Sequence, residues 1–155
     1  MHLTAHTDYA LRVLMYAALI APQTTTIDEI AGRYGLSRNH LMKIVQRLGA
    51  GGYLETLRGR GGGIRLGRPA EDICLGDVIR LTEERFNLVE CHDEAHNRCV
   101  ISGDCLLRGV MDSAAQAFMA VLDGKTLRDV IANEVPLMRQ LKFTPRERGA
   151  RAAAR

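Results

Sequence analysis

The chain has 155 residues, of which 46% are hydrophobic and 25% are charged. These values are ordinary for a globular protein, and the length suits one domain or a small domain with an accessory helix. No run approaches the roughly 18 consecutive apolar residues of a transmembrane helix. Residues 1–4 lead directly into an amphipathic pattern without a signal peptide, so we expect a cytoplasmic protein.

The net charge of +3 is unevenly distributed along the chain. Residues 33–68 contain eight lysines and arginines and one acidic residue, so this segment carries +7 and the rest about −4. A segregated basic segment is typical of a nucleic-acid interface. The alternative is a basic face that is merely solvated.

A first helix is expected from Thr4 or Thr7, either of which can cap it, to about residue 20. Asp8 and Arg12 lie one turn apart on its outer face. Pro22 disfavours helix in the residue before it and so ends the segment.

Two short helices then form a predicted helix-turn-helix motif. Thr26 caps the helix over residues 27–34, Gly35 ends it, and Ser37 caps a third helix over residues 38–48. The second helix of such a motif enters the major groove, with its first residues at the base edges. The DNA contacts predicted from its outer face are Ser37, Arg38, Asn39, His40, Lys43 and Arg47.

A wing is predicted directly after this motif. Residues 53–57 and 63–66 have the composition of strands, and the glycine-rich residues 58–62 join them as a β-hairpin. Its arginines, Arg58, Arg60 and Arg65, are expected to contact phosphates or a minor groove. A phosphate-binding P-loop is not favoured, because these glycines lead into a strand and not into a helix.

The second half of the chain is predicted to be helical. Residues 104–123 carry one long apolar stripe, which indicates a dimer interface or, alternatively, packing on the chain's own domain. The predicted fold is mainly α with a small β-hairpin, built as a winged helix-turn-helix head and a long C-terminal dimerisation helix. The predicted divisions are the head (1–84), a cysteine loop (85–105), dimerisation helices (106–134) and a flexible tail (135–155).

Three of the four cysteines, Cys91, Cys99 and Cys105, lie in a polar loop without helical or strand periodicity. Thiol ligation to a metal would order such a loop, and thiolates select zinc, copper(I) or iron–sulfur clusters. Unmetallated thiols remain an alternative. A closed site usually has four protein ligands, so a fourth must come from elsewhere. The candidates are Asp8, Cys74, His92, Asp93, His96 and Asp104, of which Cys74 is more typical of a small buried side chain.

Four motifs together resemble those of one known family. They are Leu3-Thr4 followed by Thr7-Asp8-Tyr9-Ala10-Leu11-Arg12, then Ser37-Arg38-Asn39-His40, then Arg58-Gly59-Arg60-Gly61-Gly62-Gly63-Ile64-Arg65-Leu66, and the three-cysteine loop. They resemble the Rrf2 family of dimeric, iron–sulfur winged-helix regulators over roughly residues 1–131. Within the family, residues 37–40 and 87–91 are most similar to its nitric-oxide-sensing repressors. The gap of seven residues between Cys91 and Cys99 is closer to that of iron-responsive members.

The resemblance implies a homodimeric repressor of promoter DNA, controlled by an iron–sulfur cluster and sensing nitric oxide. It implies a 4Fe–4S cluster in preference to a 2Fe–2S cluster. Its ligands would be Cys91, Cys99 and Cys105 of one subunit and Asp8 of the partner subunit, and Arg12 would orient Asp8. Iron-responsive or cluster-status regulation is the alternative within the family. An iron–sulfur redox protein is the alternative of another class, but no catalytic base paired with a nucleophile is evident, so we expect no enzyme.

Overall fold

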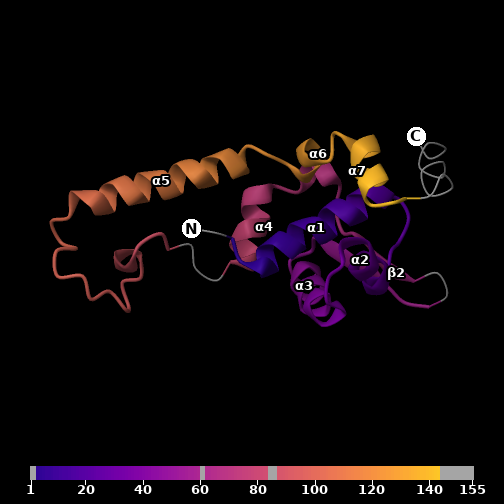
Figure 1. Ribbon diagram of the computed structural model, residues 1–155, viewed down its shortest axis with the longest axis horizontal. Coiled ribbons are helices and arrows are strands. Elements are labelled where there is room, and N and C mark those ends of the chain that lie inside the picture. Colours follow the sequence, from indigo (N-terminus) through magenta and orange to yellow (C-terminus); the bar gives the residue numbers. More distant parts are fainter. Residues whose placement is uncertain (1–2, 60–61, 84–86, 144–155) are drawn as a thin grey trace.

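The computed structural model describes residues 3–59, 62–83 and 87–143 (Figure 1). In chain order its elements are α1 (Ala5–Ile20), α2 (Ile27–Tyr34), α3 (Arg38–Ala50), β1 (Leu54–Leu57), β2 (Gly63–Leu66), η1 (Ala70–Asp72), α4 (Leu75–Thr82), η2 (Glu90–His92), α5 (Leu106–Asp123), α6 (Leu127–Val130) and α7 (Glu134–Gln140). The predicted fold class, mainly helical with one small β-hairpin, is confirmed.

The core of the head is organised around α1. Val13, Leu14 and Leu19 of this helix are fully buried, and Leu41 and Leu48 of α3 pack into the same cluster without any exposure. Figure 1 shows α1 passing through the middle of the head, with α2 and α3 below it. The inner side of α3 is therefore fixed by burial, and its polar side is left to face outward.

The helix-turn-helix motif follows from local signals. Thr26 and Glu29 form a reciprocal capping box at the start of α2, and Gly35 ends the helix with a φ of 66°. Ser37 occupies the N-cap position of α3 with extended backbone, as predicted, but its side chain accepts no capping hydrogen bond. The first turn of α3 is thus not closed by its own cap.

The wing is an antiparallel hairpin that is fastened to the segment before α2. Glu55 of β1 faces Arg65 of β2 across the strands, and their side chains form an ion pair of 2.8 Å. Thr25 and Ile64 exchange two backbone hydrogen bonds of 2.9 and 2.7 Å. The wing therefore has a fixed orientation relative to the helix-turn-helix motif. Arg60, one of the predicted DNA contacts, lies outside the described residues.

The C-terminal segment differs from the expected flexible tail over residues 135–155. Residues 134–140 form α7, and Phe143 is only 4% exposed, with its ring stacked on Tyr16 at 5.2 Å between centroids. Arg33 of α2 donates hydrogen bonds to the carbonyl oxygens of Leu141 and Lys142. The sequence pattern assigns no partner to the apolar side chains of this segment. In the structure they pack against α1. Residues 144–155 lie outside the described part of the chain.

The helix α5 extends away from the head, and the cysteine loop lies at its far end (Figure 1). No residue of α5 is buried, and Leu106, Val110 and Val121 are 89%, 61% and 67% exposed. None of the helices in the described part of the chain has the length and hydropathy that crossing a bilayer requires.

Candidate nucleic-acid interface and metal centre

The outward side of α3 carries the side chains predicted to contact DNA. The residues exposed along it are Arg38, Asn39, His40, Met42, Lys43, Gln46 and Arg47. A groove of about 830 Å³ between α3 and the wing is lined by Asn39, Met42, Lys43 and Thr56, among others. A recognition helix and a wing on the two sides of one groove can both contact a DNA backbone that passes between them.

Several of the predicted basic contacts already have partners within the chain. Arg38 forms an ion pair of 2.8 Å with Asp28, and Arg65 pairs with Glu55. Lys43 and Arg58 are exposed and form no ion pair with any other described residue. Among the described residues that are predicted to contact DNA, Lys43 and Arg58 are therefore cations whose charge is not already neutralised within the chain.

Met42 is a residue that the sequence reasoning missed. Its side chain is 45% exposed and lies among the polar residues of α3, one turn after Arg38. An apolar side chain at such a position can contact the methyl group of thymine. The signal was present in the sequence, because Met42 falls outside the inward spacing of Leu41, Ile44 and Leu48.

We expect Arg58→Ala to weaken DNA binding about equally for all sequences. The slope of log affinity against log salt should fall by about 0.9, because one phosphate contact is lost. Arg128→Ala is a matched control, since Arg128 lies in α6 on the other side of the head and pairs with Glu134 at 2.7 Å. A changed sequence preference in Arg58→Ala, with an unchanged slope, would mean that the wing reads bases instead.

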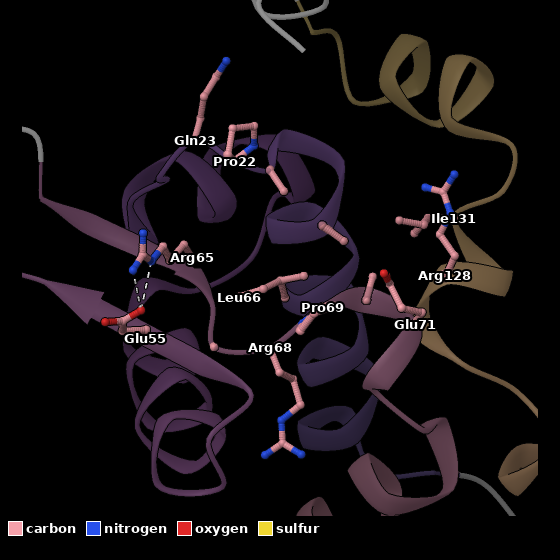
Figure 2. Close-up of a pocket in the computed structure, with 14 residues that line it drawn as sticks. Pro22, Gln23, Glu55, Arg65, Leu66, Arg68, Pro69, Glu71, Arg128 and Ile131 are labelled. Carbon is pink, nitrogen blue, oxygen red and sulfur yellow. Dashed lines mark hydrogen bonds and ion pairs between the residues drawn. The ribbon is translucent and has the colours of Figure 1, made fainter. Parts of the chain in front are cut away.

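A hollow of about 800 Å³ lies beside the base of the wing, and its lining lacks the usual catalytic nucleophiles (Figure 2). Among its lining residues there is no serine, cysteine or histidine. Arg65 is paired with Glu55, and Arg68 donates to the carbonyl oxygens of Gly51 and Gly52. Three of the charged residues around this hollow, Glu55, Arg65 and Arg68, thus hold the wing and its neighbours together.

The cysteine loop is ordered by its own polar side chains. Glu90 accepts a hydrogen bond of 2.7 Å from the backbone of Arg98, and Asn97 accepts one of 2.9 Å from the backbone of Cys99. Cys91 is 8% exposed, whereas Cys99 and Cys105 are half-buried, and all three are free thiols. Three free thiols on one loop are a donor set that fits a soft metal centre.

As the structure places them, the three loop thiols do not converge on one point. Zinc–sulfur bonds of about 2.3 Å in a tetrahedral site bring the sulfur atoms about 4 Å apart. Among the described residues, Cys91, Cys99 and Cys105 do not form a group whose ligand atoms all lie within 4.8 Å of one another. The donor set itself fits either zinc or an iron–sulfur cluster, in which each thiolate binds a different iron.

Most candidates for the fourth ligand are engaged or distant from the loop thiols. His92 accepts a hydrogen bond of 3.4 Å at Nδ1 from the backbone of Leu88. Its Nε2 is buried 3.0 Å from Oδ1 of Asp112, without hydrogen-bond alignment. His96 contacts Asp93 at 3.0 Å. The remaining candidates are Cys74, which lies in the head at the N-cap of α4, and Asp104, which is exposed beside Cys105.

Asp8 lies in the first turn of α1 and is held by Arg12. Two hydrogen bonds, of 3.1 and 2.7 Å, join the guanidinium to the two carboxylate oxygens of Asp8. A carboxylate has about four lone-pair sites, so this fork leaves it able to bind a metal. Figure 1 shows η2, which contains Cys91, apart from the start of α1 in the same chain.

The start of α1 is fastened to the end of α4. Thr7 donates a buried hydrogen bond of 2.9 Å to Thr82, and Thr4 donates from both its backbone and its hydroxyl to Glu83. Partial burial raises the pKa of Glu83, but hydrogen bonding by the neighbouring threonines, including the two bonds from Thr4, outweighs it and leaves this pKa below its ordinary value of 4.5. The ionised carboxylate of Glu83 therefore stabilises the orientation of α1.

We expect Glu83→Gln to lower the stability of the fold at neutral pH and to matter less in acid. A carboxyl whose pKa is lower in the folded state stabilises the protein above its unfolded pKa, and this contribution is lost as the pH falls through the folded value. Denaturant unfolding at pH 7 and near pH 3 should show the difference between variant and wild type shrinking. A constant difference at both values would contradict this role of the charge.

The site and fold together define a class of protein. A helix-turn-helix with a wing, followed by a thiol-rich loop and a projecting helix, is the arrangement of a winged-helix DNA-binding protein whose loop thiols are suited to a metal centre. The chain belongs to the Rrf2 family, described as iron-dependent transcriptional regulator, and the match covers residues 3–133. The predicted family is confirmed, and the chain is a DNA-binding transcriptional regulator and not an enzyme.

Its relatives agree with this assignment. It is 52% identical over 144 residues to the HTH-type transcriptional regulator NsrR of Bacillus subtilis, covering 92% of this chain and 99% of that protein. It is 49% identical over 135 residues to NsrR of Bacillus licheniformis, covering 86% and 94%. The solved structure of CymR, the global cysteine regulator of B. subtilis, matches with a TM-score of 0.69 and 25% identity, covering 86% of this chain and 98% of that one.

Proposed function

We propose that the protein is a cytoplasmic, homodimeric repressor whose binding to promoter DNA depends on a 4Fe–4S cluster and is released by nitric oxide. The observation that carries the proposal is the set of three free thiols on one loop, far along α5 from the DNA-binding head. The NsrR relatives belong to the nitric-oxide-sensing branch whose motifs this sequence resembles, which supports the choice of signal.

The exposed side of α5 supports the homodimer. Leu106, Leu107 and Val110 are 89%, 57% and 61% exposed on one helix that buries none of its residues within the chain. A contiguous apolar stripe of this kind is stable in water only when it is covered. A second α5 would cover it by the same stripe, as two-fold symmetry requires.

The proposed ligands are Cys91, Cys99 and Cys105 of one subunit and Asp8 of the partner subunit. The separation of η2 from the start of α1 within one chain favours donation between subunits. When bound, the cluster would supply iron that reacts with nitric oxide. An oxygen ligand holds iron less firmly than a thiolate does, so Asp8 is the weakest of the four bonds.

Asp8 would thereby fix the head of one subunit to the loop of the other. The two recognition helices then keep the spacing that two half-sites on DNA demand. Loss of the Asp8 bond frees the heads, and the population shifts to arrangements that do not match the half-sites.

The proposal is tested by purifying the protein without oxygen, recording its absorption spectrum, and measuring operator affinity before and after nitric oxide. We expect a brown protein whose affinity falls on treatment. An equal affinity with and without the cluster would contradict the proposal. The family description as iron-dependent favours one competing signal, and release by iron chelation but not by nitric oxide would favour an iron-responsive regulator instead.

A further inference from the structure

Arg47 of α3 is bonded to the end of α4 within the chain. Its Nε donates a hydrogen bond of 3.0 Å to the backbone carbonyl oxygen of Leu81. The last carbonyl groups of a helix have no intrahelical partner and carry the negative end of the helix dipole, so a guanidinium is well suited to this position. The Leu81 side chain also packs against the turn after α3, where a Cβ on Gly51 would lie 2.6 Å from Leu81 Cδ2.

The residue before Leu81 connects α4 to the end of α5. Arg80 donates two hydrogen bonds, of 2.6 and 2.7 Å, to the carboxylate oxygens of Asp123, the last residue of α5. This guanidinium holds the pKa of the Asp123 carboxyl below its usual range. Gly76 allows the close approach, because a Cβ at this position would overlap the carboxylate of Asp123.

The two residues after Leu81 connect α4 to the start of α1. They are Thr82, which accepts from Thr7, and Glu83, which accepts from Thr4. Four consecutive residues at the end of α4, from Arg80 to Glu83, are thus bonded to α5, α3 and α1 in turn. Figure 1 shows α4 between the end of α5 and the start of α1. In the sequence, the cysteine loop follows α4.

We propose that Arg47, which the sequence assigns to DNA contact, is a positioning residue that couples the recognition helix to the last turn of α4. The proposal rests on the proposed function, because the coupling is useful only if the cluster controls DNA affinity. A displacement of α1 at Asp8, or of α5 beyond the loop, reaches α4 through Thr82, Glu83 or Arg80. It reaches α3 through the bond between Leu81 and Arg47.

Two substitutions of Arg47 separate this role from a phosphate contact. Arg47→Gln places an amide nitrogen on Cδ, where Nε stands in arginine, and so keeps the donor to Leu81 without the charge. Arg47→Met keeps the aliphatic stem and removes the donor. Operator affinity is measured as a function of salt for the cluster-loaded and the cluster-free protein. The ratio of the two affinities reports the coupling, and the salt slope of the cluster-free protein reports phosphate contacts.

We expect Arg47→Met to reduce the affinity ratio by about tenfold and Arg47→Gln to keep it near the wild-type value, with unchanged salt slopes in both. Lys43→Met is the matched control on the same helix, and its slope should fall by about 0.9 while its ratio is kept. Asp123→Asn, which weakens the tie between α5 and α4, should reduce the ratio without changing the slope. This variant tests the route independently if Arg47→Met does not fold.

A salt slope lowered by about 0.9 in both Arg47 variants, with the affinity ratio kept, would make Arg47 a phosphate contact and overturn the inference. An unchanged ratio in both Arg47→Met and Asp123→Asn would overturn it as well. If the wild-type ratio were itself one, the proposed cluster control would fail, and the coupling with it. A large wild-type ratio that Arg47→Met preserves would overturn the coupling alone.

Discussion

Replacing Cys99 with alanine is expected to abolish both the cluster absorption and specific binding to the operator. Cys99 is one of three thiols on the loop, and the other two, Cys91 and Cys105, are themselves proposed ligands. The cluster would then be held by two thiolates and one carboxylate, and the carboxylate holds iron too weakly to replace the third thiolate. Specific affinity should fall by about a thousandfold or more, to the level of non-specific binding.

The measurement is an absorption spectrum under anaerobic conditions, followed by titration of operator DNA and of an unrelated DNA. Cys74→Ala is the matched control, because Cys74 lies at the N-cap of α4 and its thiol points to the carbonyl of Asp123. The control should keep the brown colour and the affinity. A colourless Cys99→Ala protein that still bound its operator with wild-type affinity would refute the dependence of DNA binding on the cluster.

Replacing Asp8 with alanine is expected to leave a cluster on three thiolates that is lost more rapidly. Asp8 is far in sequence from the cysteines, and the structure holds its carboxylate in the fork of Arg12 at the start of α1. Loss of a residue that merely supports a metal ligand typically weakens metal binding by about 10–100-fold, and loss of the ligand itself should cost at least as much. DNA affinity should fall by roughly tenfold although α3 is unchanged, because the head is no longer tied to the loop.

Mixed dimers decide whether Asp8 acts within one subunit or between two. An Asp8→Ala subunit paired with a Cys99→Ala subunit has one complete site if the carboxylate comes from the partner subunit. The same dimer has no complete site if Asp8 and the cysteines of one chain act together. A wild-type spectrum, cluster lifetime and DNA affinity in Asp8→Ala would remove Asp8 from the site and make His92 or His96 the better candidates.

The sequence by itself determined the helix-turn-helix motif and the wing. The capping box of Thr26 and Glu29, the left-handed Gly35 and the apolar spacing of α3 all act over a few residues, so they can be read without the fold. The glycine-rich turn between the strands is equally local. The loop with three thiols was recognisable for a similar reason, because all three lie in one polar segment of 15 residues. Thiolates are the donors that soft metal centres require.

Only the tertiary structure decided which basic residues are free to meet DNA. Arg47 and Lys43 look alike along the sequence and are both exposed, but Arg47 donates a hydrogen bond to a carbonyl 34 residues away, while Lys43 forms no ion pair with another described residue. Residues 134–143 were likewise unreadable alone, because Arg33 bonds to them from 108 and 109 positions away along the chain. Such contacts depend on which elements pack together and on which acceptors are left unsatisfied there. Charge and periodicity do not reveal either, so only the fold showed that Arg47 is bonded within the chain, to a residue of α4.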